Sequence, residues 1–430
     1  MTRILIETYG CTLNQADSRI MGSLLEKEGY DVEYGRLDVT QKNSYDFVII
    51  NTCTVKTPTE QKILNKISKV KDLGDKLIVA GCLASASPEK IEQIAPNASI
   101  INTENVTRIA EVVASAKEHK LVRYNSRELV DKMLFFSPDK SLIARIPISE
   151  GCLSNCTFCE TKFARGPLNS FSQELILKAI QMSVEKGAKE IELTAQDTGA
   201  YGLDKKTNVA ELLSKATSIE GDFKIRLGML NPEHLGKYFD ELVEAYKSEK
   251  VYKFIHLPVQ SGSNKVLSDM RRNYTVEEFE DQVRELRKKI AGLTLETDII
   301  VGYPTETTED FEESASMLER VKPEITNVSK FGARPHAEAS KLKQLSNEEI
   351  KRRSIEMSRI VRAVQAELRK KYVGTTQRIL ITEKNERSLT GRNDSYISIA
   401  IANTEANLLG TFQNVKITGS TSTCLIGNLF

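Results

Sequence analysis

The chain contains no tryptophan, only four histidines among 430 residues, and no long apolar run. Its 23 glycines and 11 prolines are too few for a collagen-like or linker-dominated protein. The longest apolar runs, such as residues 77–84, fall far short of the ~20 residues that a membrane helix needs. The formal net charge is only +1, so no global field attracts nucleic acid and any basic surface has to be local.

Residues 1–8 already have the pattern of a strand, and no charged-then-apolar leader precedes them. We therefore expect a soluble, cytoplasmic protein that has no membrane partner. The length predicts two to four domains at ~100–200 residues each. In that setting the seven cysteines are unusual, and an odd number argues for metal ligation or catalysis rather than for disulfides.

The first 130 residues alternate short apolar runs with helical patterns. Strand candidates are 3–7, 45–50, 76–80 and 99–101, and helix candidates are 16–28, 106–117 and segments that begin at Thr57 and Ser87. Thr57 and Glu60 have the spacing of a capping box. Strands that alternate with helices predict an α/β fold, here a doubly wound parallel sheet over residues 1–130. Residues 131–143 are interpreted as a linker.

A second β/α series is predicted over residues 144–345, and its six units favour a partial (β/α)6 barrel with its site at the strand C-termini. Its strand candidates are 144–149, 190–194, 223–227, 252–257, 294–301 and 325–329. A basic helix follows over residues 346–371, with Ser346 and Glu349 spaced as a capping box. Residues 372–430 are short β-branched runs broken by glycine and asparagine, which predict a small antiparallel barrel of about five strands.

Three cysteines lie close together directly after the first strand of the second series. Cys152, Cys156 and Cys159 form a Cys-x-x-x-Cys-x-x-Cys pattern. Three thiolates can hold three corners of a cubane iron–sulfur cluster and leave one iron without a protein ligand. A zinc site is the alternative, but zinc needs a fourth ligand and the loop contains no histidine.

Three further cysteines each follow a predicted strand of the first domain: Cys11, Cys53 and Cys82. Because the carboxyl ends of parallel strands share one edge of the sheet, these thiols can converge on a common site. The alternative is that they are small buried core residues, which is common for free cysteine. Spacing alone leaves both interpretations open. Cys424 has no partner signal and is interpreted as core packing.

Several longer motifs are specific in combination. They are Tyr9-Gly10-Cys11-x-x-Asn14, Asn51-Thr52-Cys53, Gly81-Cys82, the loop 151–159, the segment His256–Arg272, and the segment Thr297–Thr307. Through them the chain resembles the radical S-adenosylmethionine methylthiotransferases over essentially its whole length. The resemblance implies an N-terminal domain with three cysteines, a radical S-adenosylmethionine core and a small β-barrel called TRAM. It also implies that Cys11, Cys53 and Cys82 hold a second 4Fe-4S cluster.

Further segments resemble the archaeal and eukaryotic branch of that family, among them 150–153, 162–166 and 226–232. Members of this branch add a methylthio group to C2 of threonylcarbamoyladenosine, on the 3′ side of the tRNA anticodon. In the family's chemistry the first cluster cleaves S-adenosylmethionine to a radical, and the second carries the added sulfur. The resemblance therefore implies two 4Fe-4S clusters, S-adenosylmethionine, a tRNA anticodon stem-loop, an electron donor and a sulfur donor.

Strand ends of the second series supply the candidate contacts to S-adenosylmethionine. Gln196 and Asp197 are assigned to the methionyl amine, with an exposed loop position as the alternative for Asp197. Arg226 is assigned to the carboxylate or to a substrate phosphate, and a salt bridge is an equal alternative. The candidates for the adenosine pocket are Gln260, Asp298 and Gly302, although Gly302 more simply supplies a turn.

Support for RNA binding is local. The basic candidates near the C-terminal barrel are Arg369, Lys370, Lys371, Arg378 and Arg392, and the solvated face of an amphipathic helix is the alternative. Phe163 and Tyr201 are candidates to stack on a base, with core packing as the alternative. His336 and Glu338 stand where the family usually has a small and a hydroxyl residue, which affects local substrate contacts more than the chemistry.

Two rival functions use the same residues differently. A methylthiotransferase that acts on an aspartate of a small-subunit ribosomal protein shares the chemistry and the domain order. A non-catalytic iron–sulfur protein that binds RNA or transfers electrons needs only the cysteines and basic patches. It leaves the segment His256–Arg272 without a role.

Overall fold

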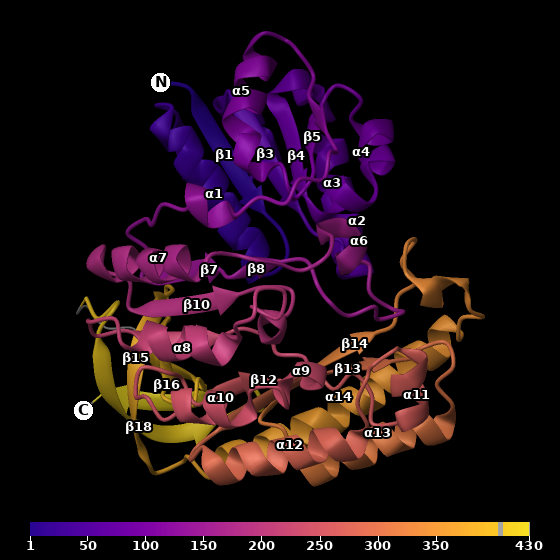
Figure 1. Ribbon diagram of the computed structural model, residues 1–430, viewed down its shortest axis with the longest axis vertical. Coiled ribbons are helices and arrows are strands. Elements are labelled where there is room, and N and C mark those ends of the chain that lie inside the picture. Colours follow the sequence, from indigo (N-terminus) through magenta and orange to yellow (C-terminus); the bar gives the residue numbers. More distant parts are fainter. Residues whose placement is uncertain (403–406, 430) are drawn as a thin grey trace.

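The computed structural model describes residues 1–402 and 407–429. Its three parts follow one another along the chain: a helix-covered parallel sheet, a half-open barrel and a small closed barrel (Figure 1). In Figure 1 the N-terminal sheet lies above the central strands, and the closed barrel lies beside them at the lower left. No helix in the described ranges is both long and apolar enough to cross a membrane.

The N-terminal part is a six-stranded sheet in the order β2-β1-β3-β4-β5-β6, with every pair parallel. The strands are β1 (Arg3–Thr8), β2 (Asp31–Tyr34), β3 (Phe47–Thr52), β4 (Leu77–Gly81), β5 (Ser99–Ile101) and β6 (Arg123–Tyr124). The helices are α1 (Thr12–Lys27), α2 (Thr57–Val70), α3 (Cys82–Ala86), α4 (Pro88–Ile94) and α5 (Ile109–Lys117). Residues of α1 and α5 pack on one face of the sheet and residues of α2 and α4 on the other, which confirms the doubly wound fold.

Three local features of this part differ from the prediction: two additional strands and the cap of α2. Strands β2 and β6 were not expected, because both are short, and β6 forms an edge whose two residues are only half-buried. The predicted capping box of α2 does not form, because Lys56 is the cap and Thr57 is already helical. Glu60 instead binds Lys90 and Arg334, both at 2.8 Å, since a buried carboxylate needs cationic partners.

The central part contains six parallel strands in two three-stranded sheets, β11-β10-β7 and β12-β13-β14. Their bounds are β7 (Ile143–Pro147), β10 (Glu190–Thr194), β11 (Lys224–Leu227), β12 (Phe254–His256), β13 (Thr294–Val301) and β14 (Ile325–Lys330). A bridge between Met229 and His256 joins the two sheets. Among the described residues β7 and β14 do not pair, so the barrel stays open, as the prediction of a partial barrel requires.

Helices cover the outside of these strands. The longer ones are α7 (Gln173–Glu185), α8 (Val209–Thr217), α10 (Phe239–Ala245), α12 (Val276–Lys289) and α13 (Thr308–Val321). The short elements are β8 (Ser149–Glu150), β9 (Asn169–Ser170), α6 (Thr161–Arg165), α9 (Pro232–Leu235) and α11 (Asn264–Asp269). Helices α12 and α13 begin with complete capping boxes, at Thr275 with Glu278 and at Thr307 with Asp310. One continuous apolar core joins the strands to these helices.

Helix α14 (Asn347–Lys370) leads into a closed five-stranded barrel. Its strands are β15 (Thr376–Lys384), β16 (Ser388–Asn393), β17 (Ser398–Ala402), β18 (Phe412–Ser420) and β19 (Leu425–Leu429). The pairing is antiparallel except between β17 and β19. Residues 403–406 and 430 of the predicted barrel lie outside the described residues. Cys424 is half-buried and close to Thr421 at the barrel surface, so it is not the core residue that was expected.

The polar side chains of α14 depart from the predicted pattern. Ser346 accepts a hydrogen bond from the Glu349 amide at 3.2 Å, but the Glu349 carboxylate binds Arg352 and Arg353. Only half of the expected capping box is therefore present. Arg353 is buried and its Nη1 lies 2.6 Å from Glu306, in the turn that follows β13.

The same turn requires a glycine at position 302. Its backbone has φ +80°, and its amide donates to Glu306 at 3.0 Å. A Cβ at this position would lie 2.6 Å from Ile350 of α14. Gly302 therefore packs against α14 as a turn residue, which is the alternative given for it above, and it is not among the residues that line the cavity described below.

We expect Gly302→Ala to destabilise the protein by about 1–3 kcal/mol, because it adds left-handed strain to an overlap with Ile350. Gly187→Ala is the matched control, since Gly187 also has positive φ (+102°) but faces open space. Urea unfolding of both variants measures the difference. Equal losses in the two variants would show that packing against α14 is unimportant.

Candidate functional site

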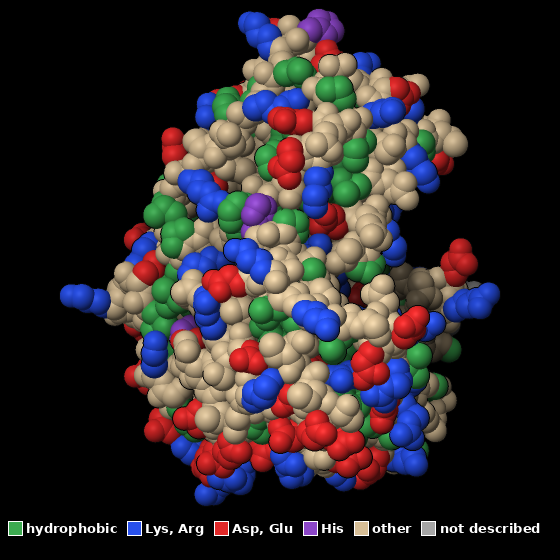
Figure 2. Space-filling model, turned by 90° about the vertical axis from the view of Figure 1, so that its right-hand side faces the viewer, with side chains coloured by type: hydrophobic (Ala, Val, Ile, Leu, Met, Phe, Trp, Pro, Cys, Tyr) green, Lys and Arg blue, Asp and Glu red, His purple; other side chains and the backbone are tan. Residues whose placement is uncertain are grey.

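A cavity of about 680 Å³ lies where the carboxyl ends of the strands of the N-terminal and central parts meet. Figure 2 shows the surface hollowed between the upper and lower parts of the molecule. Five of the six predicted cysteine ligands line this cavity, namely Cys11, Cys82, Cys152, Cys156 and Cys159. Cys53 lines an adjoining depression together with Cys11.

The loop of Cys152, Cys156 and Cys159 leaves β8 through Gly151. This glycine has φ +77°, and a Cβ on it would lie 1.9 Å from the Pro167 carbonyl oxygen. Only glycine therefore lets the loop double back against residues 166–167. Inside the loop the Cys159 amide donates to the Cys156 carbonyl at 3.2 Å, which curls the three thiols toward the cavity.

Burial keeps the thiols of Cys152 and Cys156 protonated in the absence of a metal. Burial, reinforced by the nearby Asp197 carboxylate, raises the pKa of Cys152 to about 12. Burial also raises the pKa of Cys156, against the opposing charge of Arg272, whose Nη1 lies 3.5 Å from that sulfur. A metal that takes these thiols as ligands has to displace their protons.

The structure brings the three N-terminal cysteines together. Cys11 precedes α1, Cys53 follows β3, and Cys82 is the first residue of α3 after β4. The thiols of Cys11 and Cys82 both donate to the Asn14 side-chain oxygen, at 3.5 and 3.7 Å. A Cβ on Gly10 would lie 3.0 Å from the Cys53 sulfur, so glycine admits the third thiol to this group. Burial raises the pKa of Cys53 to about 12, with the neighbouring thiols adding to the effect.

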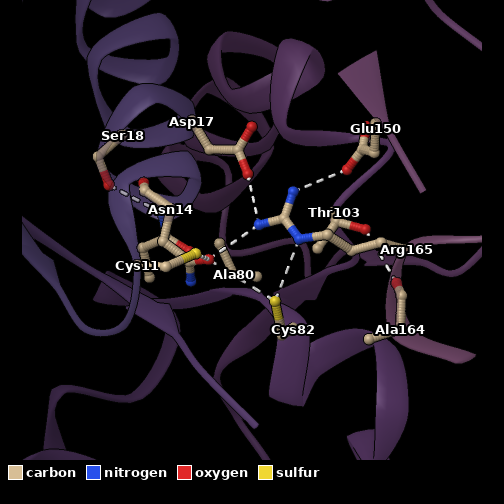
Figure 3. Close-up of polar contacts among 12 residues, drawn as sticks. Cys11, Asn14, Asp17, Ser18, Ala80, Cys82, Thr103, Glu150, Ala164 and Arg165 are labelled. Carbon is tan, nitrogen blue, oxygen red and sulfur yellow. Dashed lines mark hydrogen bonds and ion pairs between the residues drawn. The ribbon is translucent and has the colours of Figure 1, made fainter. Parts of the chain in front are cut away.

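The chain thus places one set of three thiols along the cavity and a second set at its edge, with Cys53 in the adjoining depression. The donors of each set suit an iron–sulfur cluster. In the described ranges no three His, Cys, Asp or Glu side chains are close enough to hold a single metal ion. Arg165 lies between the sets, where Figure 3 shows it pointing toward Cys82 and Asn14.

Five of the six predicted cofactor residues line the cavity: Gln196, Asp197, Arg226, Gln260 and Asp298. Three of them carry buried polar atoms that find no hydrogen-bond partner in the part of the chain that the structure describes, namely Oε1 of Gln196, Oδ2 of Asp197 and Nε of Arg226. An amide, a carboxylate and a guanidinium complement an amino acid that carries one ammonium and one carboxylate group. These residues therefore fit the methionyl end of S-adenosylmethionine.

Asp197 is held by the fold so that one oxygen stays available. Its Oδ1 accepts from the amides of Gly199 and Asn231 at 2.9 and 3.0 Å. Its Oδ2 makes no hydrogen bond within the described residues and lies 3.5 Å from His234 Nε2. Burial raises the pKa of Asp197. A cation in the cavity would compensate this burial.

Comparison with known proteins agrees with this arrangement. Residues 3–103 match the uncharacterized protein family UPF0004, residues 146–318 the radical SAM superfamily, and residues 370–430 the TRAM domain. A probable threonylcarbamoyladenosine tRNA methylthiotransferase from Pyrococcus abyssi is 41% identical over the whole of both chains. A threonylcarbamoyladenosine tRNA methylthiotransferase from Drosophila melanogaster is 31% identical over 99% of this chain and 77% of its own.

The chain belongs to the threonylcarbamoyladenosine tRNA methylthiotransferase family. Among solved structures, the radical S-adenosylmethionine methyltransferase TsrM from Kitasatospora setae has a TM-score of 0.58 at 13% identity, covering 88% of this chain and 78% of its own. The cobalamin-dependent radical enzyme OxsB has a TM-score of 0.56 at 16% identity, covering 84% of this chain and 56% of its own. At this identity the likeness concerns the fold alone.

In this methylthiotransferase the cavity wall also contains residues that the sequence analysis did not assign. His256 lies in the wall, with its Nε2 3.1 Å from Asp298, and Asn327 binds the other oxygen of that carboxylate at 2.8 Å. Burial lowers the pKa of His256, but the hydrogen bond to Asp298 outweighs this effect, so the pKa is raised. The position of His256 at the start of the motif segment 256–272 was the available signal.

The rim of the cavity is formed by the residues that depart from the family pattern. The His336 ring stacks on Phe163 with 3.7 Å between ring centroids, and Glu338 forms a two-fold ion pair with Arg271. Phe163 remains 43% exposed. Tyr201, the other candidate for stacking, is buried in the core and is not available to a base.

The predicted RNA-binding residues separate into two groups. Arg369 is only 6% exposed, and Arg392 is half-buried over the Tyr396 ring, so neither presents a free charge to a phosphate. Lys370, Lys371 and Arg378 are exposed. Arg369 and Arg392 are the less accessible residues of the five, because α14 packs Arg369 inward and the barrel places Arg392 over the Tyr396 ring.

We expect Asp197→Asn to weaken S-adenosylmethionine binding roughly 10–100-fold, from the ~1.5–3 kcal/mol of a hydrogen bond to a charged group. Equilibrium binding of labelled S-adenosylmethionine to reconstituted protein measures this change. Asp204→Asn, which alters an exposed carboxylate outside the cavity lining, is the matched control and should bind normally. Unchanged affinity in Asp197→Asn would remove Asp197 from the binding site.

Proposed function

We propose that the protein adds a methylthio group to C2 of threonylcarbamoyladenosine beside the tRNA anticodon, using two 4Fe-4S clusters and S-adenosylmethionine. One observation supports the proposal most directly: five of the six thiols, from different parts of the chain, line the same cavity, and the sixth, Cys53, lines an adjoining depression with Cys11. A single cluster would leave Cys11, Cys53 and Cys82 without a role. The names of the relatives support the substrate.

In this proposal Cys152, Cys156 and Cys159 hold the first cluster, and Gln196, Asp197 and Arg226 bind the methionyl end of S-adenosylmethionine. When bound, that cluster supplies the electron for reductive cleavage of S-adenosylmethionine. The protein orients the reactants and keeps water away. Apolar side chains in the cavity wall serve this role, among them Val55, Phe158, Met229 and Pro258.

Cys11, Cys53 and Cys82 would hold the second cluster, which would supply the sulfur when bound. Besides the RNA, the reaction then needs S-adenosylmethionine for both the methyl group and the radical, an electron donor and a sulfur donor. An adenine that enters the cavity lies between the two sets of thiols, which is the arrangement that successive hydrogen abstraction and thiolation require.

The RNA contacts are proposed to be local. Basic and acidic side chains are interspersed over the face drawn in Figure 2, in keeping with the net charge of +1. The exposed cations of the C-terminal part, Lys370, Lys371 and Arg378, are candidates for phosphate contacts. Phe163, exposed at the cavity rim, is the candidate for stacking on a base.

We expect Cys53→Ala to retain cleavage of S-adenosylmethionine but to form no methylthio product, whereas Cys152→Ala loses both. Each reconstituted variant is incubated with reductant and with tRNA that carries threonylcarbamoyladenosine. Chromatography of 5′-deoxyadenosine and mass spectrometry of tRNA nucleosides give the two readouts.

Methylthio product from Cys53→Ala would contradict the role of the N-terminal set. Modification of the ribosomal-protein aspartate, with tRNA unchanged, would favour the rival substrate. No cleavage of S-adenosylmethionine by the unaltered protein would favour the non-catalytic rival.

We expect Phe163→Trp to report substrate binding directly. The chain contains no tryptophan, so this variant has a single indole, at the cavity rim. An anticodon stem-loop whose base stacks on it should quench its fluorescence in a saturable manner. Phe239→Trp, in α10 and outside the cavity lining, is the control and should not be quenched. Equal quenching in both variants would contradict stacking at residue 163.

A further inference from the structure

Arg165, the last residue of α6, is fully buried and binds four side chains (Figure 3). Its Nε lies 3.3 Å from the sulfur of Cys82, and its Nη1 lies 2.8 Å from Glu150. Its Nη2 lies 3.0 Å from the Asn14 oxygen and 2.8 Å from Asp17. One guanidinium thus joins the N-terminal part to the central part.

A second buried cation completes the group. Lys132, from the predicted linker, lies 2.9 Å from both Asp17 and Glu150. Asp17, Lys132, Glu150 and Arg165 therefore contain two acids and two bases, and each acid contacts both bases. Charges that are removed from water in this way need full pairing, so the four residues act as one unit.

The two cations differ in one respect that matters for the chemistry. Both neutralise the same carboxylates, but only Arg165 also donates to Cys82. Glu150 and Arg165 flank the loop of Cys152, Cys156 and Cys159, two residues before it and six after it. Arg165 therefore touches a member of one cysteine set directly and holds the ends of the loop that carries the other.

The charge balance of this buried group depends on whether Cys82 is a thiol or a thiolate. With Cys82 as a thiol the four charged residues are balanced, and a thiolate at Cys82 adds one negative charge beside Arg165. A guanidinium hydrogen bond to a ligand sulfur stabilises the more negative, reduced form of an iron–sulfur cluster. Asn14, which accepts from Arg165 and from the Cys11 and Cys82 thiols, extends the contact across the set.

We propose that Arg165 is a positioning residue for the N-terminal cluster: it orients Cys82, raises the reduction potential of the cluster, and fixes its place relative to the Cys152 loop. This inference rests on the proposed function, because it takes Cys82 as a cluster ligand. Lys132 already supplies a cation to both carboxylates, so ion pairing alone does not account for Arg165. Its contact with the Cys82 sulfur is the additional feature.

The test uses the full chain with Cys152, Cys156 and Cys159 all changed to Ala, so that only the N-terminal cluster forms. After anaerobic reconstitution, iron and sulfide are measured and the midpoint potential is determined by an EPR-monitored redox titration. The parent should hold about four iron atoms per chain. Arg165→Met, Arg165→Lys and Lys132→Met are then compared in this background.

We expect Arg165→Met to shift the potential to more negative values or to lose iron. Arg165→Lys, which keeps the charge but not the planar fork, should show a smaller shift of the same sign. Lys132→Met removes an equally buried cation from the same carboxylates without touching Cys82, so it should shift the potential clearly less than Arg165→Met does.

An unchanged potential with full iron in either Arg165 variant would overturn the inference, as would an equal shift in Lys132→Met. If Arg165→Met does not fold, Arg165→Lys decides, and if neither folds Arg165 serves only the fold and the inference fails. A parent that holds no cluster would instead refute the N-terminal cluster of the proposed function, and the inference would fall with it.

Discussion

The structure depends on a small group of fully buried charges between two parallel sheets. Asp17 comes from the first helix, Lys132 from the connection, and Glu150 and Arg165 from either side of the second cysteine loop. Removing one member of a buried ion group typically costs about 3–5 kcal/mol, because its partners remain buried without compensation. The two sheets can therefore adopt very few relative positions, and the common cavity depends on the one that is observed.

A second contact between the same parts works in a similar way. Arg334 lies 2.8 Å from Glu60 and donates to the Thr54 carbonyl, directly after Cys53. Glu160, next to Cys159, accepts from the Thr54 hydroxyl at 2.6 Å. Polar bonds that are buried beside the cysteines thus connect residues far apart in the chain. Such bonds are directional, which suits a site where two sets of thiols must face one substrate.

The C-terminal barrel reaches the same core from the opposite ends of the strands. Tyr396 inserts beside Glu190 at the start of β10 and lies over Tyr252 and Phe254, with Arg226 of the cavity wall 5.6 Å from its ring. Burial, reinforced by the Glu192 carboxylate, raises the pKa of Glu190 to about 7. The barrel that is similar to TRAM domains is therefore packed against the layer of side chains directly behind the cavity.

Much of the fold could be predicted from periodicity, because strand β4 is a continuous buried apolar run and helix α13 buries one regular apolar stripe. Short edge strands such as β2 were not predicted, because four partly exposed residues carry little periodic pattern. The cysteines were recognisable by their spacing and by their places after strands. The structure favours the alternative roles of Gly302 and Arg369, a turn and a core contact, because the same residue type serves these roles as readily as a ligand site.

The sequence by itself determined the local chemistry: which segments form strands, which thiols lie in one tight loop, and which family the motifs indicate. Only the tertiary structure decided which distant residues meet. Two such features join residues more than twenty positions apart: the convergence of Cys11, Cys53 and Cys82, and the contact of Arg165 with Cys82. A third, the burial of Arg369, depends on how helix α14 packs against its neighbours. Local propensity carries no information about such contacts, since they depend on how whole elements pack and how buried charges find partners.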